Sequence, residues 1–201
     1  MSDQNTIASV RTLTLHRHSD KTEHELDKGK RISAGGAKLA NGVASRLYPA
    51  NQPIDIVFHG PLPRTLQTLT YMMFNNAAFD NVVQYPEPIS GLGDDAMFAT
   101  MFTDEVKVLI PEHGLLGAIL EYYDDETAKA FANQCLAGIK AQFDLMELGQ
   151  TGVGVFHDPT IALAAWLLGY EDVRSLESME SISFQQDTDG TITVISLNAL
   201  D

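Results

Sequence analysis

Short apolar segments that read as β-strands alternate with segments of helical periodicity along most of this chain. The four predicted strands are rich in apolar and β-branched residues and cover residues 12–16, 54–58, 82–85 and 152–156. The predicted helices have apolar residues at helical spacing and cover residues 33–47, 61–73, 95–148 and 159–168. Strands that alternate with helices in this way predict an α/β fold with a mainly parallel central sheet and helices on both faces.

Two parts of the second half depart from strict alternation. Residues 95–148 are mainly helical and are interrupted near Gly114, and we expect them to form a helical insertion within a single domain that spans the whole chain. Residues 182–184 and 192–195 read as two further strands separated by a short, turn-rich segment. They predict an antiparallel hairpin at the end of the chain.

Composition excludes several classes of partner. The chain has 13 lysines and arginines against 27 aspartates and glutamates, which gives a formal net charge of -14. Nucleic acids and anionic membranes attract basic surfaces, so this balance argues against both as partners. No run approaches the roughly 18 consecutive apolar residues of a membrane-spanning helix. We expect a soluble, cytoplasmic protein, and the single cysteine, Cys135, fits a reducing compartment.

Basic and titratable residues follow three of the predicted strands. Arg17 and His18 follow the first, His59 and the loop with Arg64 follow the second, and His157 with Asp158 follows the last. In open α/β sheets, ligands bind outside the carboxyl ends of the strands. Arginine suits phosphate, and a neutral histidine can act as a nucleophile or base. These residues therefore predict a functional site at this edge of the sheet.

Four sequence motifs resemble those of the histidine phosphatase superfamily, also called the phosphoglycerate mutase-like group. Residues 15–19 (LHRHS) are similar to its strand that ends in Arg-His-Gly, and residues 32–35 (ISAG) to its helix-opening Leu-Thr-x-x-Gly. Residues 61–68 (PLPRTLQT) resemble Ser-Pro-Leu-x-Arg-Ala-x-Gln-Thr, and residues 153–157 (VGVFH) resemble the strand that delivers a second histidine. The four motifs occur in the family's order, each on the expected element.

The resemblance implies a phosphatase that works through a transient phosphohistidine. His18 is then the nucleophile, and Arg17, Arg64 and His157 surround the phosphate and stabilise the charge that develops on its oxygens. The arrangement needs no metal and no cofactor. His18 must be unprotonated at one nitrogen to attack, so its other nitrogen should be held by a neighbouring acceptor.

The proton for the leaving oxygen has two candidate donors. Glu87 lies after the third predicted strand, where many members of the family place their acid, whereas Asp158 directly follows the second histidine, as in the acid-phosphatase branch. Asp94 and Asp95 are weaker candidates. Either assignment predicts a raised pKa, because a general acid must hold its proton near neutral pH.

Two residues depart from the family pattern close to the expected phosphate site. Ser19 replaces the usual glycine after the nucleophile, and we expect either a different backbone at this turn or a phosphate contact from the Ser19 hydroxyl. His59 stands where serine is common, and we expect it to line the same pocket. These departures bear on the substrate and the efficiency more than on the reaction class.

The substrate class and two rival functions stay open at this point. A small phosphorylated metabolite and a phosphoprotein, including a protein phosphohistidine, both fit as substrates, and a mutase is disfavoured because no extra basic cluster stands out. A noncatalytic module that binds phosphate or phosphopeptides is one rival. The other is a metal-dependent hydrolase that uses His16, His18 and Asp20, because their spacing is similar to that of metal ligands.

Overall fold

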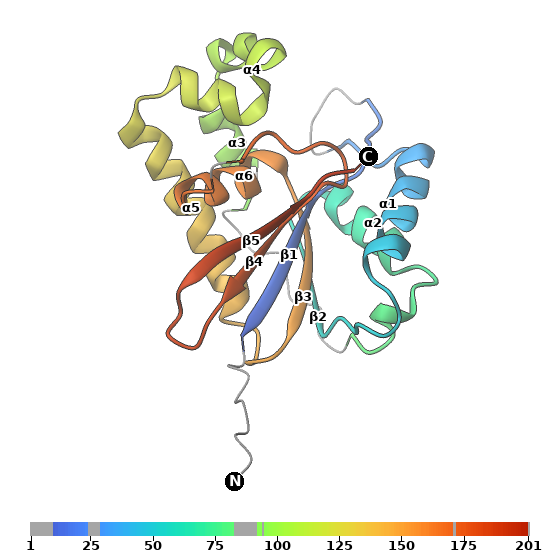
Figure 1. The fold of residues 1–201 in the computed structure, drawn as a ribbon. Helices are drawn as coiled ribbons and strands as arrows, with labels where there is room; N and C mark the ends of the chain where they lie inside the picture. Colours follow the sequence, from blue (N-terminus) through green and yellow to red (C-terminus); the bar gives the residue numbers. More distant parts are fainter. Residues whose placement is uncertain (1–9, 24–28, 83–91, 94, 171, 201) are drawn as a thin grey trace.

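The computed structural model describes residues 10–23, 29–82, 92–93, 95–170 and 172–200. Five strands of the described residues form one sheet in the order β2-β3-β1-β4-β5 (Figure 1). Their bounds are β1 Arg11–Arg17, β2 Ile56–His59, β3 Thr151–Phe156, β4 Ser181–Gln186 and β5 Ile192–Asn198. β1 pairs in parallel with β3, and β3 with β2, whereas β4 is antiparallel to both β1 and β5. Only β4 thus runs against the other four, which confirms a mainly parallel sheet with a terminal hairpin.

Helices cover both faces of this sheet, as the alternating sequence predicts. Figure 1 shows α1 and α2 on one side and α3 to α6 on the other. The α-helices are α1 Ala34–Leu47, α2 Pro63–Met73, α3 Asp95–Met101, α4 Asp104–Tyr122, α5 Asp125–Phe143 and α6 Asp158–Leu167, and a 3-10 turn covers Ala77–Phe79. Within the described residues, none of these helices is long and apolar enough to cross a membrane.

The two-residue period of the strands separates two apolar cores. On β1, Leu13 and Leu15 are fully buried and pack with helices α3 to α6. On β3, Val153 and Val155 are fully buried and pack on the opposite face with helices α1 and α2. Apolar residues on both faces of a strand are typical of a sheet covered by helices on both sides. The fully buried Cys135 belongs to the first core, on α5.

Most predicted elements lie where the sequence places them. Ser33 caps α1, and its hydroxyl accepts from the backbone N–H of Gly36 at 2.9 Å. The expected break near Gly114 is a kink in α4, where this glycine adopts a positive φ of 70°. The strand expected at residues 82–85 lies outside the described residues except for Val82, which is not in a strand.

The sheet brings three chain segments to one edge. In the parallel ladder Arg17 lies opposite Phe156, and Val155 lies opposite both His16 and His59. The three strands therefore end at nearly the same level, with β3 in the middle. The residues that follow β1, β2 and β3 are held side by side at the carboxyl ends, as expected for a ligand site in such a sheet.

Candidate active site

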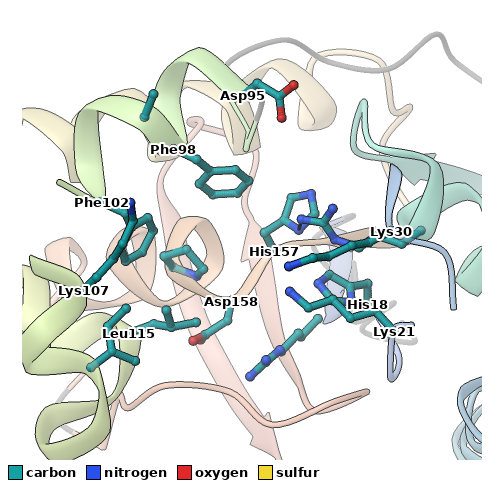
Figure 2. Close-up of a pocket in the computed structure, with 15 residues that line it drawn as sticks. His18, Lys21, Lys30, Asp95, Phe98, Phe102, Lys107, Leu115, His157 and Asp158 are labelled. Carbon is teal, nitrogen blue, oxygen red and sulfur yellow. Dashed lines mark hydrogen bonds between the residues drawn. The ribbon is translucent and has the colours of Figure 1, made fainter. Parts of the chain in front are cut away.

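A cavity of about 670 Å³ opens at the carboxyl ends of β1 and β3. Its lining combines two histidines and several basic side chains with an apolar wall (Figure 2). The polar and charged lining residues are Arg17, His18, Lys21, Lys30, Arg64, Asp95, Lys107, His157 and Asp158. The structure thus brings Arg17, His18, Arg64, His157 and Asp158 together, although they come from three distant parts of the sequence.

His18 lies directly after β1 and is buried, with 6% of its surface exposed. Its Nδ1–H donates to the carbonyl oxygen of Ser19 at 2.8 Å, so the ring proton sits on Nδ1 and the lone pair is on Nε2. Burial lowers the pKa of His18 to about 3, and the positive charges of Arg64 and Arg17 act in the same direction. At neutral pH the imidazole is therefore neutral and carries a nucleophilic nitrogen.

His157 lies beside His18, with their ring centroids 5.2 Å apart. Its Nδ1 accepts from the Arg64 guanidinium at 3.4 Å. Burial, together with nearby positive charge that includes Arg64, lowers the pKa of His157 well below 6.5, so the ring is neutral and its proton is on Nε2. That Nε2 atom is buried without a hydrogen-bond partner among the described residues. A buried donor of this kind needs an acceptor, and a phosphate oxygen meets this need.

Asp158 is the first residue of α6 and is almost completely buried. Its Oδ1 accepts from the backbone N–H of Leu176 at 2.5 Å, whereas its Oδ2 is buried and has no partner among the described residues. Burial raises the pKa of Asp158 to about 7, against the opposing effects of the Leu176 N–H and the Arg17 charge. The carboxyl group can therefore hold a proton near neutral pH, as a general acid must.

The segment at residues 174–180, between α6 and β4, positions two of these groups. The Leu176 backbone N–H holds Asp158, and the Leu176 carbonyl oxygen accepts from the Arg17 guanidinium. Arg174 and Glu180 close the segment with two hydrogen bonds of 2.7 Å. One peptide segment thus fixes both Arg17 and the candidate acid Asp158.

Ser19 is buried and is not among the residues that line the cavity. Its hydroxyl donates to the carbonyl oxygen of Gly36 at 2.7 Å, and its backbone N–H donates to Thr68 at 3.1 Å. Gly36 approaches the same turn so closely that an added Cβ would lie 2.3 Å from the Asp20 carbonyl oxygen. Glycine is therefore required at this end of α1, and the Ser19 hydroxyl holds the turn in place.

Of the other predicted site residues, Asp95 lines the cavity, His59 does not, and two lie outside the described residues. The His59 Nδ1–H donates to the carbonyl oxygen of Gly60 at 2.8 Å, and His59 is not among the lining residues. Glu87 and Asp94 lie outside the described residues. Asp95 lines the cavity from α3 with an exposed side chain.

Lys21 and Lys30 also line the cavity, and sequence reasoning missed both. They lie in the stretch between β1 and α1, and Figure 2 shows them close to His18. Lys21 could have been predicted, because it lies three residues after His18, whereas Lys30 lies twelve residues after it and carries no such signal. With these two lysines present, the absence of an extra basic cluster no longer argues against a carboxylated phosphate substrate.

His16 and Asp20, two of the three residues of the alternative metal site, are each hydrogen-bonded to other groups of the protein. Both ring nitrogens of His16 are used, since Nδ1–H donates to the Met179 carbonyl at 2.9 Å and Nε2 accepts from the Tyr48 hydroxyl at 2.5 Å. Asp20 accepts from the Ser178 hydroxyl at 2.5 Å. Among the described residues, no group of three or more potential ligands could hold a metal ion. His16 thus joins β1 to the segment before β4.

The burial of His16 should make stability depend on pH. Burial lowers the pKa of His16 from 6.5 to about 4. The unfolded chain therefore binds this proton first, and the free energy of unfolding falls as the pH drops below 6.5, by about 1.4 kcal/mol per pH unit for this one group. We expect the free energy of unfolding, measured with urea, to fall by about 2 kcal/mol less between pH 7.5 and 5 in His16→Gln than in the wild type, because the full slope is reached only between the two pKa values.

The exposed His113 on α4 provides the matched control for this measurement. His113→Gln makes the same substitution on an exposed side chain, so it shows what the change of residue alone does to unfolding. An unchanged slope in His16→Gln would mean that His16 is not held neutral by burial.

The architecture matches known structures over nearly its whole length. A phosphoglycerate mutase from Bacillus anthracis str. Sterne matches with a TM-score of 0.68 and 14% sequence identity, over 96% of this chain and 94% of that one. This chain has the phosphoglycerate mutase-like fold. A phosphoserine phosphatase from Entamoeba histolytica, in complex with 3-phosphoglyceric acid, matches with a TM-score of 0.60 and 18% identity, over 95% and 98% of the two chains. The protein histidine phosphatase SixA, complexed with tungstate, matches with a TM-score of 0.56 and 14% identity, over 94% and 96%.

The similarity between this chain and these structures is a similarity of fold. No protein-family model matches the sequence, and no curated protein matches it significantly. The phosphoglycerate mutase-like fold confirms the architecture that the four motifs imply. Because one fold hosts different reactions, the activity has to be argued from the site itself.

Proposed function

We propose that this protein is a histidine phosphatase that hydrolyses a phosphomonoester or a protein phosphohistidine through a phosphohistidine intermediate on His18. The observation that carries the proposal is the state of His18. It is neutral, its proton is fixed on Nδ1 by the Ser19 carbonyl, and it lies in a cavity that Arg17, Arg64 and His157 also line. A nucleophile beside fixed cations and an unpartnered donor suits phosphoryl transfer.

In the first step, the lone pair on Nε2 of His18 attacks the phosphorus in line with the leaving oxygen. A nitrogen–phosphorus bond forms and the phosphorus–oxygen bond to the leaving group breaks. The two arginines and the Nε2–H of His157 stabilise the charge on the three remaining oxygens. Asp158 gives the proton on its Oδ2 to the departing oxygen, which leaves as an alcohol.

In the second step, the Asp158 carboxylate takes a proton from a water molecule. The resulting hydroxide attacks the phosphorus, the nitrogen–phosphorus bond breaks, and inorganic phosphate and neutral His18 are released. The raised pKa of Asp158, about 7, allows it to donate a proton in one step and accept one in the next. We propose Asp158 as this acid and base on the strength of its burial and its unpartnered Oδ2. Glu87 stays the alternative.

Trapping the intermediate tests this proposal directly. The protein is mixed with radiolabelled p-nitrophenyl phosphate, quenched in alkali, in which phosphohistidine is stable, and digested for mass spectrometry. We expect turnover, a label on His18, and the same rate in the presence of a metal chelator. Turnover with no label on His18 would overturn the covalent mechanism, and loss of activity in chelator would overturn its metal independence. Phosphate binding with neither turnover nor label would identify a noncatalytic binding module.

A further inference from the structure

The cavity has two chemically different ends. Basic residues and the two histidines lie where β1 and β3 end, and Figure 2 shows His18, His157, Lys21 and Lys30 gathered on one side. The apolar wall comes from α3, α4 and the turn between them: Phe102 in the turn and Ile110 and Leu115 on α4 line it, and Phe98 on α3 links it to the histidines, with its ring centroid 5.0 Å from that of His157. We propose, on the basis of the phosphatase function proposed above, that the substrate is the phosphomonoester of an alcohol that carries an aromatic ring.

The direction of attack connects this wall to the leaving group. In-line displacement requires the leaving oxygen to lie on the side of the phosphorus that faces away from His18. In Figure 2 Asp158 lies between His18 and the apolar wall, with Phe102 and Leu115 beyond it. A group that accepts a proton from Asp158 and departs away from His18 therefore meets the side chains of α3 and α4. Lys21 and Lys30 lie near His18, at the end of the cavity where we propose that the phosphate binds.

The composition of the wall favours a leaving group with an aromatic ring over one with a negative charge. Phe98 and Phe102 lie with their ring centroids 6.2 Å apart and their planes at 47°, and both are partly exposed. Aromatic side chains arranged in this way offer edges and faces to a further ring. Lys107, the cation on this side, is exposed and is already paired with Asp104 at 2.9 Å. Asp95 adds a negative charge, so a carboxylate or second phosphate on the leaving group is disfavoured.

A matched pair of substrates tests the inference. Ethyl phosphate and 2-phenylethyl phosphate both release a primary alcohol, so their intrinsic reactivity is similar and they differ in the ring alone. We expect kcat/KM to be at least about tenfold higher for 2-phenylethyl phosphate, because contacts with an apolar pocket act through differential transition-state binding. Phosphoserine, which has a charged leaving group of similar length to ethanol, should be hydrolysed no faster than ethyl phosphate.

A variant of the wall then tests its location. Phe102→Ala should lower kcat/KM for 2-phenylethyl phosphate by about tenfold and leave ethyl phosphate within about twofold. Val108→Ala is the matched control, because Val108 lies on the neighbouring helix α4 with 77% of its surface exposed and is not among the lining residues. Ile110→Ala replaces Phe102→Ala if circular dichroism shows that the latter is unfolded.

The outcomes separate the two proposals. Equal kcat/KM values for the two alkyl phosphates, or faster hydrolysis of phosphoserine, would overturn the aromatic substrate class and leave the phosphatase function standing. An equal loss on both alkyl phosphates in Phe102→Ala would overturn the role of the wall. Failure of the wild type to hydrolyse any of these substrates, with no label on His18, would overturn the phosphatase function itself.

Discussion

Replacing His18 with asparagine should abolish phosphatase activity, with kcat falling by about 10⁴-fold or more, because the group that accepts the phosphoryl is removed. The asparagine amide can still donate to the Ser19 carbonyl, as the His18 Nδ1–H does at 2.8 Å, so the turn after β1 should keep its shape. The substitution leaves Arg17 and Arg64, which also line the cavity, unchanged. Steady-state hydrolysis of p-nitrophenyl phosphate measures the loss, and isothermal titration with inorganic phosphate should show that binding is retained.

His59 supplies the matched control for this substitution. It is the last residue of β2 and also donates its Nδ1–H to the carbonyl oxygen of the next residue at 2.8 Å, but it does not line the cavity. His59→Asn should therefore keep kcat within about threefold, as a substitution away from the reacting groups usually does. Unchanged activity in His18→Asn would rule out the mechanism. A large loss in His59→Asn would instead restore this residue to the phosphate site.

The sequence predicted the fold well because each element carries its own periodic signal. β3 has apolar residues on both faces, with Phe156 in one core and Val153 and Val155 in the other, and α1 begins after the expected cap at Ser33. The ends of elements were less accurate. β2 begins at Ile56 instead of residue 54, because Ile54 pairs its backbone N–H with Ala78 in place of the sheet.

The residues at the ends of the strands could be predicted to lie together, but the backbone groups that hold them in position could not. Arg17, His18 and His157 could be predicted, because parallel strands end at the same edge. Neither the Ser19 carbonyl nor the peptide of Leu176 could be predicted as a positioning group. Every residue has a backbone carbonyl group and every residue except proline has a backbone N–H, so these contacts leave no trace in residue types and depend on the tertiary fold.

The apolar wall illustrates a second limit of the sequence. Phe98 and Phe102 are four residues apart, which is the ordinary spacing of a helix face that packs on a core. Phe102 does pack beside the core, and Phe98 lies with its ring centroid 5.0 Å from that of His157. The position of α3 and α4 above the end of β3 is what turns a common helical pattern into a cavity wall.

Asp158→Asn should slow the first chemical step only when the leaving group needs a proton, and should slow the second step in every case. With ethyl phosphate, whose alkoxide needs a proton to depart, we expect phosphorylation of His18 to slow by about 10²–10⁴-fold. With p-nitrophenyl phosphate, p-nitrophenolate leaves without a proton, so phosphorylation should slow by less than about tenfold. The second step still lacks its base, so stopped-flow measurements should show a burst of p-nitrophenolate followed by slow turnover. Asparagine keeps the acceptor for the Leu176 N–H, which Asp158 now provides through Oδ1.

The dependence of kcat/KM on pH tests the role of Asp158 independently. Burial raises the pKa of Asp158 to about 7, and an acid works only while protonated, so kcat/KM of the wild type for ethyl phosphate should fall as the pH rises through 7. Arg17, Arg174 and Glu177 also act on this carboxyl group, and all three remain in the variant. The phosphate of the substrate titrates near pH 6 with both proteins, so its effect cancels in the comparison of Asp158→Asn with the wild type. The variant should lack the decline above pH 7. If Glu87→Gln loses the decline and Asp158→Asn retains it, Glu87 is the acid, and the buried carboxyl group of Asp158 acts only to hold Leu176.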